Sequence, residues 1–128
     1  MKILAIDTAT EACSAALFID DATLDSGITS QYRLAPRQHS RLILQMIDDL
    51  LQQADISVNN LDAIAFGRGP GSFMGLRIAA GVVQGIAFAC DLPVIPVSTL
   101  KTMAQRVYQE TGNTHVLSAI DARMDEVY

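Results

Sequence analysis

The sequence has few charged residues and no dense cluster of basic ones. Charged residues make up 18% of the 128 residues, against about 25% in an average globular domain. The nine Lys and Arg residues are scattered, with Arg33, Arg37 and Arg41 as a loose cluster, and the formal net charge is −5. Because neutralising phosphates requires clustered basic side chains, we expect this chain not to bind nucleic acid by itself.

Cysteine and histidine are equally scarce. The two cysteines, Cys13 and Cys90, lack the spacing of a metal or redox motif, which indicates core residues in a reducing compartment. The two histidines, His39 and His115, are far apart in the sequence, whereas metal ligands must cluster. We therefore expect no metal and no cofactor. His39, beside Ser40 at a predicted helix start, is interpreted as a capping or interface residue.

The sequence also lacks a predicted targeting or membrane-spanning segment. Lys2 precedes only a short apolar strand that Asp7 interrupts, unlike the apolar stretch of a signal peptide. The predicted helix 78–90 is too short to cross a bilayer, and Arg77 and Gln84 lie at its start and within it. The expected location is cytoplasmic, without contact to a membrane.

A glycine-rich loop separates two predicted elements. Gly67, Gly69, Gly71 and Gly75 lie between an apolar strand and an apolar helix, where Ser72 suits the N-cap. Such a loop either binds an anion at the helix N-terminus or makes a tight turn. No Lys follows it, as a P-loop requires, and the glycine spacing does not fit a dinucleotide site. The tight turn is the favoured interpretation.

The helix after this loop is apolar on all sides, which predicts burial on all sides. One face can lie on a sheet, but the chain offers no obvious cover for the other. Ile78, Val82 and Ile86 share one face, and the small residues Gly81 and Gly85 permit another helix to come close. We interpret the uncovered face as a partner surface.

The predicted order of elements is three strands, then helices and strands in alternation. The expected strands are 2–6, 13–19, 23–33, 61–66, 93–97, 115–121 and 126–128, and the expected helices are 42–54, 74–90 and 99–109, with Pro36 in the first turn of the first helix. This order predicts a mixed α/β sheet with helices on its faces. It matches the ribonuclease H-like lobe of the actin, sugar kinase and Hsp70 (ASKHA) superfamily, with residues 1–110 as that lobe and 111–128 as the start of a truncated second one.

Four short motifs in this order resemble the TsaB (YeaZ) family over the whole chain. They are IDTAT at 6–10, GRGPGSF at 67–73, GLR at 75–77 and DAR at 121–123. Most family members carry Thr where this chain has Met74, and they usually continue for roughly another hundred residues. The resemblance implies a non-catalytic protein that binds and activates TsaD in forming threonylcarbamoyladenosine in tRNAs that read codons beginning with A. It also implies contact with the ATPase TsaE through the complex, self-association as a homodimer, and only indirect contact with tRNA.

The expected partner surface combines residues of the first two helices. Its members are Arg37, His39, Leu42, Met46, Met74, Arg77, Ile78, Val82 and Ile86. Arginines near helix starts gain nothing from the helix dipole, whose positive end is there. Arg37, Arg41 and Arg77 are therefore expected to be paired with charges or to face a partner. We expect Arg77 to bind a carboxylate or backbone carbonyls near the glycine loop, in this chain or across the interface.

Four residues are candidates for a nucleotide site. Asp7 and Asp121 end the first strands of the two lobes, where superfamily ATPases carry carboxylates for hydrated magnesium, and Thr8 and Thr10 could offer hydroxyls to phosphate. The first turn, however, lacks the glycine that would admit a phosphate, and Glu11 adds a negative charge. The favoured interpretation is that Asp7 and Thr10 make local hydrogen bonds in a turn.

Two alternative functions remain open at this stage. An ASKHA-type ATPase fits the fold and the two aspartates. A glycoprotease-like metallopeptidase is the less favoured alternative, since the helix after Ser98 lacks the histidine pair expected of TsaD-like enzymes.

Overall fold

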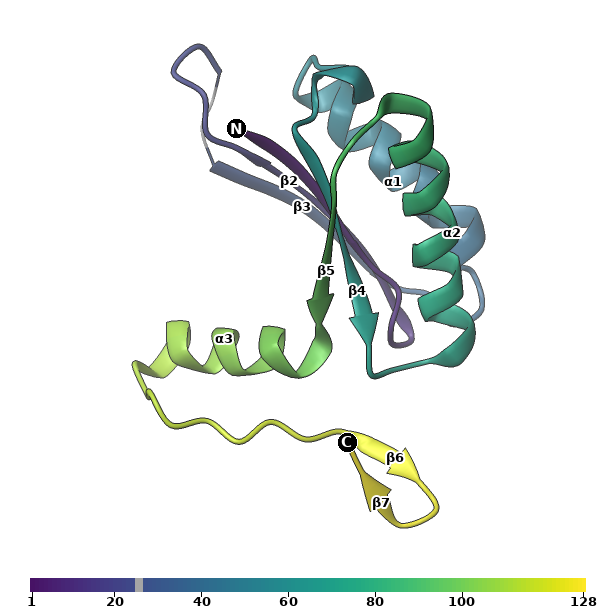
Figure 1. Ribbon diagram of the computed structural model, residues 1–128, viewed down its shortest axis with the longest axis vertical. Helices are drawn as coiled ribbons and strands as arrows, with labels where there is room; N and C mark the ends of the chain where they lie inside the picture. Colours follow the sequence, from purple (N-terminus) through teal and green to yellow (C-terminus); the bar gives the residue numbers. More distant parts are fainter. Residues whose placement is uncertain (25–26) are drawn as a thin grey trace.

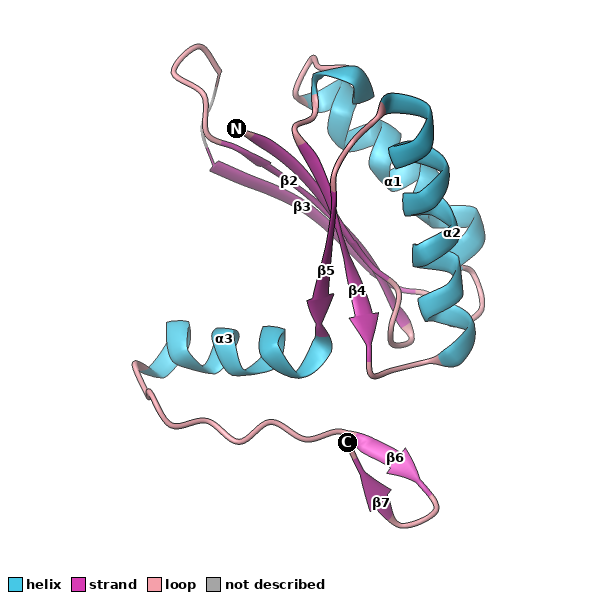
Figure 2. Ribbon diagram, in the orientation of Figure 1, coloured by secondary structure: helices cyan, strands magenta, loops and turns pink. Residues whose placement is uncertain are grey.

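Five strands form one mixed sheet in the computed structural model, which describes residues 1–24 and 27–128 (Figures 1 and 2). The strands are β1 (Lys2–Asp7), β2 (Ala12–Ile19), β3 (Gly27–Leu34), β4 (Ala63–Gly69) and β5 (Val94–Ser98). Their order is β3-β2-β1-β4-β5; β2 is antiparallel to β1 and β3, and β4 is parallel to β1 and β5. The predicted α/β fold, a meander followed by parallel strands, is confirmed.

Two long helices cover one face of this sheet. They are α1 (His39–Gln53) and α2 (Phe73–Cys90), with a 3-10 turn, η1 (Val58–Asn60), between them (Figure 1). The helix α3 (Thr99–Thr111) follows β5 and extends away from the side that α1 and α2 occupy (Figure 2). A separate two-stranded sheet, β6 (Asp121–Arg123) with β7 (Glu126–Val127), lies beyond it.

The core lies between the sheet and these two helices. Buried and half-buried residues alternate along β1 and β2, so that Leu4, Ile6 and Leu17 point toward the helices. On α1 the buried apolar residues, Ile43 and Leu50 among them, recur at helical spacing. This alternation in the strands and helical period in α1 are the patterns from which the fold was predicted.

The helix starts follow the predicted capping chemistry in two of three cases. Ser72 accepts a hydrogen bond from the Gly75 N–H, and Ser98 accepts one from the Lys101 N–H, at 3.3 and 3.4 Å. The helix α1 begins at His39, not near Pro36. Residues 36–37 form a turn in which Arg37 has a φ of 64°, and this left-handed conformation is incompatible with a helix.

Three predicted strands differ from the observed ones. The third begins no earlier than Gly27, since Thr23 and Leu24 lie in a turn and a bend, and residues 25–26 of the prediction lie outside the described part. The fourth, β4, runs from Ala63 to Gly69, so it begins two residues later and ends three residues later than predicted. The prediction of a strand over 115–121 is wrong: residues 115–120 are irregular, because among the described residues no neighbouring strand pairs with them.

The helix α2 is longer and more exposed than predicted. Its 18 residues make it the one helix of the described chain that could cross a membrane by length and composition alone, and 22% of it is buried. Its buried residues, Gly75, Ala79, Val83 and Ala87, form a single stripe against the sheet. The expectation of burial on all sides therefore fails within this chain, since only one stripe of the helix meets the sheet.

The Asp21 carboxylate, which lies shortly after the end of β2 and beside the start of β1, is stabilised as an anion. Asp21 accepts hydrogen bonds from the hydroxyl and the backbone N–H of Thr23, at 2.7 and 2.9 Å, and lies 2.9 Å from the Lys2 ammonium. These contacts hold the pKa of Asp21 well below its usual range, and the hydrogen bond from the Thr23 hydroxyl contributes most, followed by the Thr23 N–H and Lys2.

Candidate functional site: the glycine loop and the outer faces of α1 and α2

Three glycines allow β4, the loop after it and α2 to pack closely against the end of β1. A Cβ at Gly67 would overlap the Asp7 carboxylate, one at Gly75 would overlap the Thr8 carbonyl oxygen, and one at Gly71 would lie 2.6 Å from the Ala9 carbonyl oxygen. Real Cβ atoms do not approach carbonyl oxygens so closely. Gly71 and Gly75 are therefore needed at this junction, because backbone atoms occupy the space that a side chain would fill.

Hydrogen bonds across the same junction use the polar groups of the loop. The buried Thr8 hydroxyl donates to the Gly75 carbonyl at 2.7 Å, and the Ser72 N–H donates to the Ala9 carbonyl at 2.6 Å. The Gly75 N–H is bonded to the Ser72 hydroxyl. The loop thus fixes the start of α2 to β1, which confirms its interpretation as a tight turn.

The four nucleotide candidates are engaged in local structure. An Asp7 carboxylate oxygen accepts from the Ala9 N–H at 2.7 Å, and the Thr10 hydroxyl accepts from the Ala12 N–H at 3.1 Å. Thr8 is fully buried and bonded to α2. An Asp121 carboxylate oxygen accepts from the Arg123 N–H at 2.7 Å. The interpretation that Asp7 and Thr10 make turn hydrogen bonds is confirmed, and the Thr8 hydroxyl is used inside the fold.

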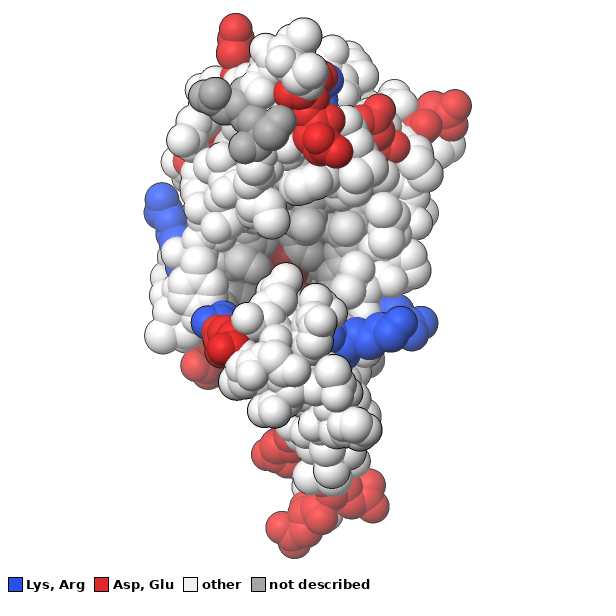
Figure 3. All heavy atoms as spheres, turned by 90° about the vertical axis from the view of Figure 1, so that its left-hand side faces the viewer, with Lys and Arg blue, Asp and Glu red and all other residues white. Residues whose placement is uncertain are grey.

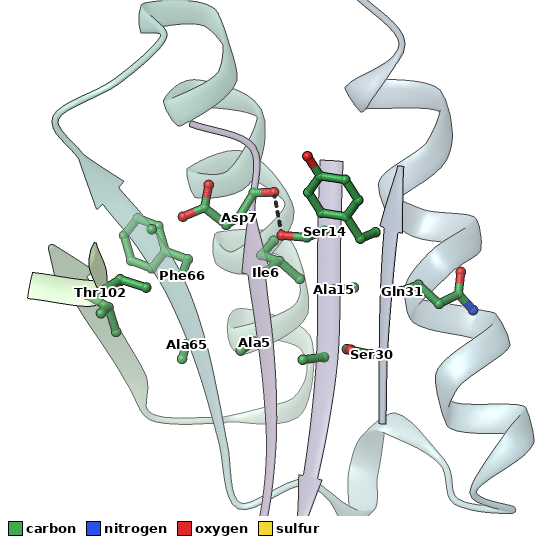
Figure 4. A pocket seen from close by; sticks show the side chains of 14 residues that line it. Ala5, Ile6, Asp7, Ser14, Ala15, Ser30, Gln31, Ala65, Phe66 and Thr102 are labelled. Carbon is green, nitrogen blue, oxygen red and sulfur yellow. Dashed lines mark hydrogen bonds between the residues drawn. The ribbon is translucent and has the colours of Figure 1, made fainter. Parts of the chain in front are cut away.

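The two aspartates do not line a common cavity. Asp7 lines a hollow of about 330 Å³ on the face of the sheet opposite α1 and α2, which Figure 3 shows in the middle of that face. Ser14 donates to the Asp7 carbonyl at 3.4 Å on the neighbouring strand (Figure 4), and Ala5 and Phe66 give the hollow an apolar lining. Asp121 lines a different hollow, beside the glycine loop. The described residues contain no group of three His, Cys, Asp or Glu side chains that could hold a metal ion.

Two of the predicted interface residues are buried inside the chain. Met46 is 1% exposed and belongs to the core beneath α1. His39 is 8% exposed, and its Nε2 lies 3.2 Å from the Ala12 carbonyl oxygen. Both predictions are corrected: these side chains face the sheet, because they lie on the same side of α1 as Ile43 and Leu50.

The other predicted residues lie on or beside an open surface. Leu42, Ile78, Val82 and Ile86 are half-buried and pack against the edge of the core, while Met74 is 62% exposed. A Cβ at Gly81 or Gly85 would meet nothing within 4 Å. We call the surface formed by Leu42, Met74, Ile78, Gly81, Val82, Gly85 and Ile86 the α1–α2 face. Arg37 is exposed at the start of α1 and lines a hollow that Met74 and Ile78 also line.

Arg77 behaves differently from the prediction within this chain. Its guanidinium lies 3.5 Å from the centroid of the Phe73 ring, one helical turn earlier. No carboxylate of the described residues forms an ion pair with it. Arg77 therefore makes a cation–π contact in place of the expected hydrogen bonds. The sequence analysis did not identify Phe73 and Phe88 as exposed aromatic residues, although they are 69% and 91% exposed. Their large size and their position on an apolar helix were the features of the sequence that could have drawn attention to them.

The family profile described as TsaD, tRNA N6-adenosine threonylcarbamoyltransferase, matches residues 23–128. The chain belongs to the TsaD family. Within this family its similar relatives are named TsaB, so the resemblance drawn from the four sequence motifs is confirmed.

Relatives of this kind are similar along the whole chain. It is 52% identical to the tRNA threonylcarbamoyladenosine biosynthesis protein TsaB of Escherichia coli and 49% identical to that of Haemophilus influenzae, over all of its residues. A solved structure titled as an uncharacterised protein with similarity to peptidase YeaZ, from Pseudomonas aeruginosa, superimposes with a TM-score of 0.91 at 53% identity, covering 99% of this chain and 56% of that one. The chain spans about half the length of the TsaB relatives, 53% and 52% respectively.

Proposed function

We propose that this member of the TsaD family is a non-catalytic partner that binds and activates TsaD in forming threonylcarbamoyladenosine in tRNA. The observation that carries the proposal is the α1–α2 face. It is apolar, only half-covered by the chain, and open over Gly81 and Gly85.

The composition of this face suits a paralogous partner. Among its seven residues none is charged, and exposed apolar surface of this kind marks interaction sites on soluble proteins. A partner with the same fold presents a similar pair of helices, so self-association as a homodimer and binding to TsaD would compete for one surface. The ATPase TsaE would join through that complex, in the cytoplasm.

Two potential nucleophiles of the chain, Ser72 and Cys13, are used by the fold itself. Ser72 is bonded to the Gly75 N–H, and Cys13 is buried in the core. Acyl transfer needs a group that stabilises developing charge, and we assign that role to TsaD. This chain contributes a rigid helical surface that shifts TsaD toward its active state.

The test places a lysine on the α1–α2 face without disturbing the fold. Gly85 is exposed with open space around its Cα, so Gly85→Lys should fold normally but prevent close approach of a second helix. The matched control is Gln84→Lys, at the neighbouring exposed position on the side of α2 that Phe88 occupies. Binding to TsaD is measured by calorimetry, and self-association by sedimentation.

We expect Gly85→Lys to lose both associations and Gln84→Lys to keep them. Equal binding by the two variants would remove the α1–α2 face from the proposal. In a reconstituted reaction with threonylcarbamoyl-adenylate and tRNA, modification should need TsaD, and product formed by this chain alone would refute the non-catalytic role.

A further inference from the structure

A hollow of about 650 Å³ continues the α1–α2 face beyond its apolar residues. Met74 and Ile78 belong to that face and also line the hollow. The hollow lies at the edge of the sheet where β1 ends and where α1 and α2 begin (Figure 1). A protein that covers the α1–α2 face therefore also covers this hollow, and the polar groups inside it then lose their contact with water.

The hollow carries an excess of one positive charge. Its lining includes the exposed side chains of Arg37, Arg123 and Glu11. None of these three forms an ion pair with another described residue. The remaining titratable residue of the lining is His39, whose ring is buried and lies 3.2 Å from the Ala12 carbonyl oxygen. With His39 neutral, two guanidinium groups stand against one carboxylate.

The other acidic side chains near this edge do not line the hollow. Asp7 lines the hollow on the opposite face of the sheet, and Asp121 lines the one beside the glycine loop. Each accepts a hydrogen bond from the backbone two residues further along. Asp125 and Glu126 line none of these three hollows. Because Glu11 already offsets one arginine, a group with a single negative charge balances the lining.

Burial under a partner makes this balance necessary. A buried guanidinium without a counter-charge is strongly destabilising, whereas one that is paired with a carboxylate through two hydrogen bonds is well satisfied. The start of α1 favours the same kind of group. Its N-cap residue, Gln38, makes no capping hydrogen bond through its side chain, and the N-terminus of a helix carries the positive end of the helix dipole.

We propose that this hollow receives the carboxylate of an Asp or Glu side chain of TsaD, which pairs with Arg37 when TsaD covers the α1–α2 face. The observation that carries the proposal is that the hollow and the face share Met74 and Ile78. Apolar contacts are non-directional, so the ion pair would fix the position of TsaD and select it as the partner. This inference rests on the proposed function and adds the chemistry of the contact.

The backbone at Arg37 permits a test that separates binding from folding. Arg37 has a φ of 64°, a conformation that glycine adopts without strain and arginine does not. Arg37→Gly should therefore keep or raise the urea midpoint of unfolding while it removes the guanidinium. A control for the backbone is Asp55→Gly, since Asp55 has a φ of 52° and lies after α1, outside the hollow.

Binding to TsaD is measured by calorimetry on the full-length protein, without tRNA or nucleotide. We expect Arg37→Gly and Arg37→Gln each to weaken binding by at least about tenfold, because the partner carboxylate is left unpaired. Arg37→Glu should weaken it further, since two carboxylates then face each other. Asp55→Gly should bind normally, as should Arg33→Gln, which removes the same charge from an exposed position of β3.

The outcomes separate this inference from the proposed function. Normal binding by Arg37→Gln, with none by Gly85→Lys, would overturn the inference alone. It would also fall if Arg37→Glu bound at least as tightly as Arg37→Gln, because the partner group would then not be an acid. A lower urea midpoint in both Arg37→Gly and Arg37→Gln would assign Arg37 to the fold and overturn it as well. Failure of the unaltered protein to bind TsaD would refute the proposed function and this inference together.

Discussion

Two glycines of α2 should respond in opposite directions to the same substitution. In Gly75→Ala the new Cβ overlaps the Thr8 carbonyl oxygen, whereas in Gly81→Ala it meets nothing within 4 Å. Both positions are helical, so both gain about 0.5–1 kcal/mol of helix propensity from alanine. At Gly75 this gain is opposed by overpacking, which costs about 3 kcal/mol, the upper end of the usual range, because the neighbour is backbone and cannot rotate away.

The net expectation is about 2 kcal/mol of destabilisation for Gly75→Ala and about 0.5–1 kcal/mol of stabilisation for Gly81→Ala. Urea unfolding followed by circular dichroism measures both free energies of unfolding on the same chain. If Gly75→Ala is as stable as Gly81→Ala, the junction between α2 and β1 does not have the packing described here, and the role of the loop as a tight turn would have to be abandoned.

Three further predictions concern buried and charged groups. Thr8→Val should lower the free energy of unfolding by about 0.5–1.5 kcal/mol, since it removes the buried hydrogen bond from the Thr8 hydroxyl to the Gly75 carbonyl, and Thr8→Ser should restore most of this in the same urea experiment. Because the pKa of Asp21 is lowered in the folded state, the ionised carboxylate stabilises the fold above its unfolded pKa of about 4, and this contribution is lost as the pH falls below that value. Asp21→Asn should therefore make the free energy of unfolding depend less on pH in acid, and an unaltered pH dependence would contradict this. Burial raises the pKa of the Cys13 thiol, so a thiol reagent should modify the half-buried Cys90 in the native protein and reach Cys13 only on unfolding, which mass spectrometry would detect.

Much of the fold was predictable because it depends on interactions between neighbouring residues and on the spacing at which apolar residues recur along the chain. The alternation in β1 and β2 and the helical spacing on α1 come directly from the residue order. Ser72 and Ser98 cap helices through bonds that span three residues, so neighbouring residues are enough to predict them. The turn hydrogen bonds of Asp7 and Thr10 span two residues each and were predictable for the same reason.

The errors concern properties that depend on distant parts of the chain. A strand over 115–121 had the composition of a strand but no neighbour to pair with among the described residues. Leu42 and Met46 lie one helical turn apart on α1, yet only Met46 is fully buried, because the sheet beneath the helix decides which side chains it covers.

The sequence by itself determined the order of the elements in the five-stranded sheet, the alternation of buried residues along β1 and β2 and the existence of the glycine turn. Only the tertiary structure decided that Gly75 is required at a contact with Thr8, 67 residues earlier, while Gly81 in the same helix has open space. Local patterns follow from bonds between neighbouring residues, whereas close contacts follow from how the fold brings α2 against the end of β1.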